Sequence, residues 1–191
     1  ESGMEAAVLK QAAEGKVIFG ICGGYQMLGE TLADPEGVEA GGSMKGMGLL
    51  PMDTVFASEK TRTRVSGVFQ NVSGDLQELS GTVLEGYEIH MGVSTLREGS
   101  GTLTMIQDHA ATTEKKNDGA YYKNVYGTYV HGAYDKEEVA KAVIAALGRK
   151  KGINTDEITG VDFQEFKETQ YDILADALRE HLDMKKIYQI L

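Results

Sequence analysis

The sequence of 191 residues predicts an α/β sheet domain. Three observations support this fold class. Residues 2–32 have the pattern of a helix, a short apolar strand and a second helix. Short strand-like segments fill the middle of the chain, and residues 125–147 return to a strand followed by a helix. We expect one domain that spans residues 1–191.

The first elements are predicted from apolar spacing and turn residues. Apolar side chains recur on one face of a helix over residues 2–14, and Ser2 with Glu5 fits a capping box at its start. Residues 16–22 form an almost continuous apolar run, which is typical of a short buried strand. A pair of glycines then turns the chain, and helical spacing resumes over residues 25–32.

The middle of the chain is read as strands separated by turns. Residues 46–56, 61–69 and 86–90 are short and strand-like. Residues 107–124 are polar, and we expect an exposed loop or hairpin tip there.

The last elements are a strand and two helices. Residues 125–130 form a strand that ends at His131. Asp135 is expected to cap a helix over residues 136–147, and residues 163–181 have the spacing of a final amphipathic helix.

Composition excludes several classes of protein. The formal net charge of −10 and a pI near 4.9 argue against nucleic acids and anionic membrane surfaces as partners. No apolar run approaches the roughly 20 residues that cross a bilayer, and nothing resembles a signal peptide. We therefore expect a cytoplasmic protein. The chain has one cysteine, which is either a buried small hydrophobe or a reactive thiol.

The segment around Cys22 favours the reactive thiol. Gly20-Ile-Cys-Gly-Gly24 has the spacing of a nucleophile elbow, with cysteine in the place of serine. Gly20 and Gly24 are expected where side chains would collide, and the N–H of Gly23 is expected to face an oxyanion. The following helix N-terminus would favour the thiolate. We expect no metal, because neither a second cysteine nor a nearby histidine is available as a ligand.

A cysteine nucleophile needs a base, and the chain has four histidines. His109 and His181 lie in polar or amphipathic surroundings and are expected to be solvated. His131 follows a strand and precedes a glycine, as a base at a sheet edge would. His90 competes with it, and spacing alone does not separate the two.

Three segments together resemble the C-terminal glutamine amidotransferase domains of the cobyric acid and cobyrinate diamide synthase family. They are residues 20–29 (GICGGYQMLG), 85–92 (EGYEIHMG) and 126–132 (YGTYVHG), and they span most of the chain. The first is shared in outline by all class I amidotransferases. Gln26 favours the cobyric acid enzyme over the diamide enzyme.

This resemblance implies an open mixed sheet flanked by helices, of the flavodoxin-like class I amidotransferase type. It implies that Cys22 is the nucleophile and His131 the base. Gln26 would contact substrate glutamine, and Tyr87 and His90 would line the pocket.

The resemblance also implies a division of labour. The domain would hydrolyse glutamine and pass ammonia to an ATP-dependent synthetase domain, which amidates carboxylates of a corrin during cobalamin biosynthesis. It needs no cofactor itself, and ATP and Mg²⁺ are expected only in the synthetase. The alternatives are a stand-alone cysteine hydrolase of the same fold and a catalytically silent binding or regulatory module.

Two departures from the wider class I pattern matter. A glutamate typically stands two residues after the catalytic histidine, but this chain has Ala133 there. The resembled subfamily also lacks this glutamate. Glu88 and Asp135 are the candidates to orient the imidazole, with ordinary surface carboxylates as the alternative. The preceding synthetase domain and an upstream strand are expected to be missing, so the sequence is expected to be an N-terminally truncated fragment.

Overall fold

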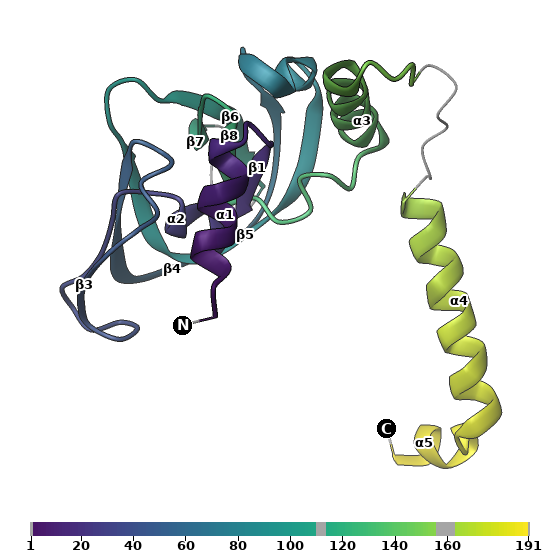
Figure 1. The fold of residues 1–191 in the computed structure, drawn as a ribbon. Coiled ribbons are helices and arrows are strands. Elements are labelled where there is room, and N and C mark those ends of the chain that lie inside the picture. Colours follow the sequence, from purple (N-terminus) through teal and green to yellow (C-terminus); the bar gives the residue numbers. More distant parts are fainter. Residues whose placement is uncertain (1, 110–113, 156–162, 191) are drawn as a thin grey trace. The chain divides into compact units, whose positions relative to one another are not determined.

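A computed structural model describes residues 2–109, 114–155 and 163–190. The chain divides into two compact units, residues 1–158 and 159–191, which are described separately. The first unit contains one eight-stranded sheet and three α-helices (Figure 1).

The strands of this sheet run in the spatial order β1-β8-β7-β6-β4-β2-β3, and β5 pairs with β4. Their bounds are β1 Ile18–Ile21, β2 Thr31–Asp34, β3 Gly42–Lys45, β4 Met52–Phe69, β5 Val83–Leu96, β6 Gly101–Asp108, β7 Lys115–Tyr122 and β8 Val125–Thr128. β1 pairs with β8, and β2 with β4, in parallel, whereas the other pairs are antiparallel. The sheet is therefore open and mixed, and the expected fold class is confirmed.

Helices pack on both faces of β1 and β8, because these two strands are apolar on both faces. Alternate residues of β1 and β8 enter two different core clusters, since successive side chains of a strand point to opposite faces. α1 (Met4–Ala13) and α2 (Gly23–Met27) contribute to one cluster. α3 (Glu137–Lys151) and the 3₁₀ helix η1 (Gly74–Leu79) contribute to the other.

Several local expectations differ from the structure. Residues 107–124 are not one loop, because β6 ends at Asp108 and β7 begins at Lys115; residues 110–113 lie outside the described residues. The predicted capping box of α1 is wrong, since the N-cap is Gly3 rather than Ser2, whose hydroxyl accepts only a 3.4 Å hydrogen bond from the N–H of Met4. Asp135 is not the cap of α3, which starts after Lys136.

The second unit contains α4 (Phe163–His181) and α5 (Met184–Ile190). The expected final helix is confirmed with these bounds for α4, whereas α5 was not anticipated. The helices expose several large apolar side chains, among them Phe166, Ile173 and Leu174. Within the described ranges, no helix combines the length and apolar character that crossing a bilayer requires.

Candidate active site around Cys22

Cys22 lies at the turn between β1 and α2, in a backbone conformation that side chains rarely adopt. Its φ is 53° and its ψ is −115°. Such a conformation costs about 1–3 kcal/mol and is concentrated at functional sites. A Cβ at Gly20 would lie 2.8 Å from backbone atoms of Gly24 and Tyr25, so glycine is required there as expected. The same expectation is wrong for Gly24, where a Cβ would meet nothing within 4 Å.

Strand β8 supports the strained turn from one side and β5 lies against the thiol. The backbone N–H of Cys22 donates to the carbonyl of Thr128 at 2.9 Å. Its Sγ donates to the carbonyl of Ile89 at 3.6 Å, and the side chain remains partly exposed. The thiol therefore faces the backbone of the β5 segment that carries Tyr87 and His90.

His131 lies against the same segment of β5. It forms an antiparallel bridge with Tyr87, in which each backbone N–H donates to the other residue's carbonyl at 3.1 and 2.9 Å. Cys22 contacts Ile89, only two positions along that strand from Tyr87, which corresponds to roughly 7 Å at the usual rise per residue. The fold thus brings Cys22 and His131 to one short stretch of backbone, although no hydrogen bond joins their side chains among the described residues.

The two ring nitrogens of His90 both have partners, unlike Nε2 of His131. Nδ1 of His90 lies 2.8 Å from the carbonyl of Gly92, and its Nε2 lies 3.4 Å from Oε1 of Glu88. The ring also stacks on Tyr129 with centroids 3.8 Å apart. Nε2 of His131, by contrast, is buried without a hydrogen-bond partner. This difference separates the two histidines, which spacing alone did not.

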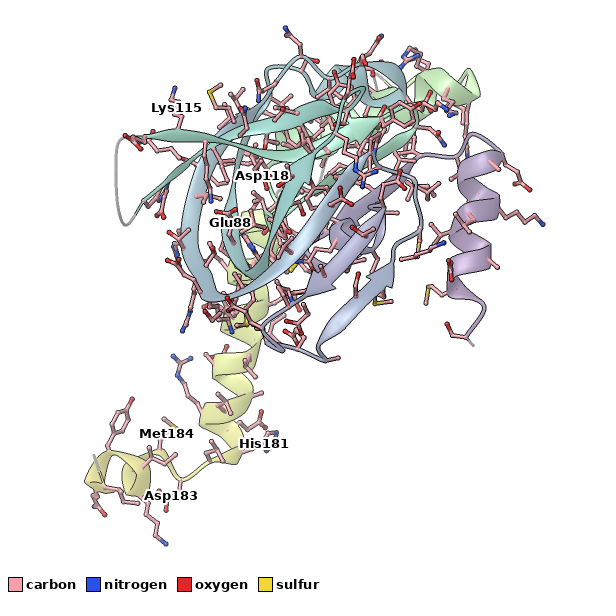
Figure 2. All side chains as sticks on the ribbon, turned by 90° about the vertical axis from the view of Figure 1, so that its left-hand side faces the viewer. Glu88, Lys115, Asp118, His181, Asp183 and Met184 are labelled. Atoms are coloured by element: carbon pink, nitrogen blue, oxygen red, sulfur yellow. The ribbon has the colours of Figure 1, made fainter. Side chains whose placement is uncertain are left out.

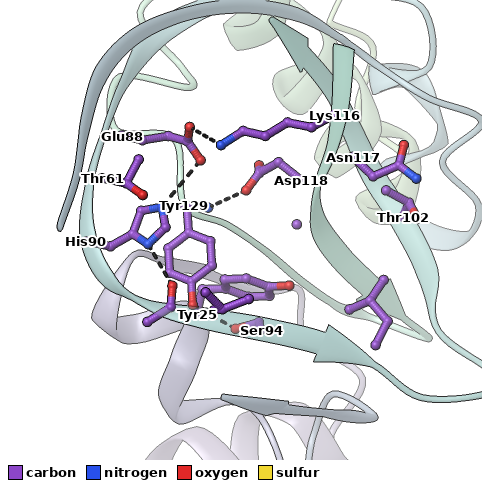
Figure 3. A pocket seen from close by; sticks show the side chains of 14 residues that line it. Tyr25, Thr61, Glu88, His90, Ser94, Thr102, Lys116, Asn117, Asp118 and Tyr129 are labelled. Carbon is purple, nitrogen blue, oxygen red and sulfur yellow. Dashed lines mark hydrogen bonds and ion pairs between the residues drawn. The ribbon is translucent and has the colours of Figure 1, made fainter. Parts of the chain in front are cut away.

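A polar cavity of about 380 Å³ lies on the side of β5 where Glu88 and His90 point (Figure 3). Glu88 is 2% exposed and pairs with Lys116, with 2.7 Å between Oε2 and Nζ. Burial on its own would raise the pKa of the Glu88 carboxyl, but hydrogen bonds from His90 and Lys116 outweigh it and lower the pKa.

Asp118, on β7, is a second buried carboxyl at this cavity. Its side chain accepts hydrogen bonds from the hydroxyls of Thr104 and Thr128 and from the backbone N–H of Tyr129. Burial raises the pKa of this carboxyl, and the three hydrogen bonds oppose the shift only in part. Figure 2 shows Asp118 and Glu88 within the curled sheet and Lys115 at the outer end of β7.

The family model described as a CobB/CobQ-like glutamine amidotransferase domain matches residues 1–139. The chain belongs to this family. The expectation of a glutamine amidotransferase is therefore confirmed.

Curated relatives of this amidotransferase domain are named cobyric acid synthase. Over the whole chain, the identity is 51% to the protein of Ruminiclostridium cellulolyticum, 49% to that of Lachnoclostridium phytofermentans and 41% to that of Salmonella agona. The chain spans only 37–39% of the length of these relatives. The resemblance to the amidotransferase domain of cobyric acid synthase is thus confirmed.

Two solved structures are more distant. One crystal structure of a glutamine amidotransferase is 15% identical with a TM-score of 0.46, and the match covers 77% of this chain and 69% of that one. Another, from Thermotoga maritima, is also 15% identical with a TM-score of 0.43, and the match covers 92% of this chain and 64% of that one.

In the amidotransferase domain, Gln26 is buried behind the elbow. Its Nε2 donates to the hydroxyl of Tyr129 at 3.3 Å, and that hydroxyl is 2.7 Å from the hydroxyl of Ser94. Gln26 and Gly23 also line a second cavity of about 470 Å³ that opens beside the elbow. This cavity therefore offers space beside Gly23, the residue that follows Cys22.

The sequence did not reveal how Asp118 and Lys116 contribute to the site. Both lie in the segment that was predicted to be an exposed loop or hairpin tip, although Asp118 is only 6% exposed. A polar strand residue whose partners come from neighbouring strands leaves no periodic signal in the sequence. Among the described residues, no three side chains of the usual ligand types gather to hold a metal ion.

Proposed function

We propose that this domain hydrolyses glutamine, with Cys22 as nucleophile and His131 as general base. The observation that carries the proposal is the strained elbow at Cys22, which lies against the same stretch of β5 as His131. His90 is less suited to be the base, because both of its ring nitrogens already have partners. Catalytic hydrogen bonds are often formed only when substrate binds, so the lack of a direct bond between Cys22 and His131 does not oppose the pair.

The proposed reaction is acyl transfer through a thioester. His131 accepts the thiol proton, and the thiolate attacks the side-chain carbonyl carbon of glutamine. The backbone N–H of Gly23 donates to the oxyanion that forms. His131 then returns a proton to the departing nitrogen, which leaves as ammonia. Water attacks the γ-glutamyl thioester, and its proton passes through His131 as glutamate and the free thiol are released.

The cavity beside Gly23 and Gln26 suggests how the substrate is held. We assign the space beside Gly23 and Gln26 to the part of glutamine beyond its amide, because this cavity adjoins the proposed oxyanion donor. The carbonyl of Ile89 faces the sulfur and can accept a hydrogen bond from the amide nitrogen of the substrate. In this arrangement Tyr87 and His90 flank the reacting groups from β5.

The destination of the ammonia is inferred from the relatives. Because the relatives of highest identity quoted above are named cobyric acid synthase, we propose that an ATP-dependent synthetase partner uses the ammonia to amidate corrin carboxylates. ATP and Mg²⁺ would then bind to the synthetase, and the amidotransferase domain would need no cofactor. Use of ATP by the partner agrees with the cytoplasmic location expected from the sequence.

The test is the Cys22→Ser variant, assayed with the synthetase for amidation supported by glutamine or by ammonium. Amidation with glutamine should be abolished, whereas amidation with ammonium should persist. His131→Ala should lower glutamate release by a factor of about 10²–10⁴, as expected for a missing general base. His90→Ala is the matched control and should chiefly raise KM. Glutamine-dependent turnover by Cys22→Ser would show that the nucleophile is wrong.

A further inference from the structure

Among the described residues, no carboxylate is hydrogen-bonded to the ring of His131, although one commonly fixes a catalytic imidazole. Ala133 occupies the position two residues later and is buried. Asp135 is exposed, and among the described residues no hydrogen bond joins its side chain to His131. Glu88 is buried rather than a surface group, but its two oxygens face His90 and Lys116. Another group must therefore set the orientation of the ring.

The ring of Tyr87 lies flat against the ring of His131. Their centroids are 4.9 Å apart and their planes differ by 5°. The backbones of Tyr87 and His131 are also joined by the two hydrogen bonds of the antiparallel bridge. Gly86 permits this close approach, since a Cβ there would lie 2.1 Å from the carbonyl oxygen of His131.

A contact with the face of the His131 ring suits a general base, because a hydrogen bond to the ring nitrogens would occupy the atoms that accept the proton. The stack restricts rotation of the imidazole, yet it leaves Nε2 without a partner and so able to accept the thiol proton. Once His131 is protonated, the face of the Tyr87 ring also attracts the cation.

We propose that Tyr87 is the positioning residue for His131, and that its stacked ring replaces the missing carboxylate. This inference rests on the proposed function, in which His131 is the base. It differs from the expectation that Tyr87 simply lines the glutamine pocket. A pocket role predicts an effect on KM, whereas a positioning role predicts an effect on kcat that requires His131.

The experiment compares Tyr87→Leu with the conservative Tyr87→Phe, which keeps the ring. Tyr87→Leu should lower kcat for glutamate release about 10–100-fold with little change in KM, because misplacing a reacting group by about 1 Å can cost about 10². Tyr87→Phe should restore most of this loss. Tyr87 is 49% exposed, so neither change empties a core site, and thermal unfolding should confirm that both variants are folded.

A second readout separates positioning from general damage. Cys22 is the only cysteine, so the rate of its alkylation by iodoacetamide against pH reports on the Cys22–His131 pair alone. Tyr87→Leu should shift this profile, and in a His131→Ala background it should cause no further loss of activity or shift. A raised KM with unchanged kcat, or an equal loss in both backgrounds, would overturn the proposal. Failure of Cys22→Ser or His131→Ala to lower activity would instead refute the proposed function.

Discussion

Substitution of Gly20 by alanine tests whether the strained elbow is needed for the chemistry. The added methyl would lie 2.7 Å from Cδ1 of Leu28 and 2.8 Å from the Cα of Tyr25. The Leu28 side chain can rotate away, but the backbone of α2 cannot. The helix must therefore retreat from 2.8 Å to the 3.4 Å at which ordinary contact begins. Overpacking of this kind costs about 1–3 kcal/mol.

The displacement should also reach the nucleophile, because Cys22 directly precedes α2. We expect Gly20→Ala to lower glutamate release and Cys22 alkylation by about tenfold or more, since positioning errors near 1 Å cost up to about 10². Urea unfolding measures the stability loss in parallel.

Gly24→Ala provides the matched control within the same motif. A methyl at Gly24 meets nothing within 4 Å, and the residue lies inside α2. Replacing glycine by alanine in a helix gains roughly 0.5–1 kcal/mol, so this variant should be at least as stable as the parent. Equal losses in the two variants, or an unaffected Gly20→Ala, would refute the reasoning from steric contact.

Three further predictions concern the buried carboxyls and the sheet edge. Because burial raises the pKa of Asp118, the parent should lose stability relative to Asp118→Asn as the pH rises above the usual carboxyl pKa of about 4. A stability difference that does not depend on pH in urea unfolding would contradict this. Glu88 has a lowered pKa, so its stabilisation is present above its usual pKa and lost in acid. Lys116→Met should accordingly cost about 1–2 kcal/mol near neutral pH and less in acid, whereas Lys115→Met should cost almost nothing. Among the described strands β1 pairs with β8 alone, so its other edge should promote self-association, and sedimentation of a concentrated sample as a monomer would oppose this.

The local part of the site could be predicted because it depends on neighbours in sequence. The strand before Cys22, the sharp turn and the requirement for Gly20 follow from a few adjacent residues, and each agrees with the structure. The requirement for Gly24 was wrong because the space around that position is set by elements that pack from elsewhere. The length of α2 was overestimated for a similar reason, since the chain leaves the helix to form β2.

The choice between the two histidines could not be made from the sequence, because it depends on contacts between distant strands. In the sequence, His90 and His131 both lie in or directly after strand-like segments, and each has a glycine within two residues. Their contacts distinguish them. The ring of His90 contacts Glu88 and stacks on Tyr129, whereas the ring of His131 stacks on Tyr87. These side-chain contacts depend on how the sheet curves, and the spacing of residues along the sequence does not reveal that curvature.

Asp118 connects the stability of the fold to the strain at Cys22. Cys22 is kept in its costly conformation partly by a hydrogen bond from its N–H to the carbonyl of Thr128. Asp118 accepts hydrogen bonds from the hydroxyl of Thr128 and from the backbone N–H of Tyr129. These two residues lie three and two positions before His131. One buried carboxyl thus restrains both the residue that supports Cys22 and the segment that leads to His131. Burial raises the pKa of Asp118 because desolvation disfavours its charged form, and the hydrogen bonds from Thr128 and Tyr129 oppose this shift only in part.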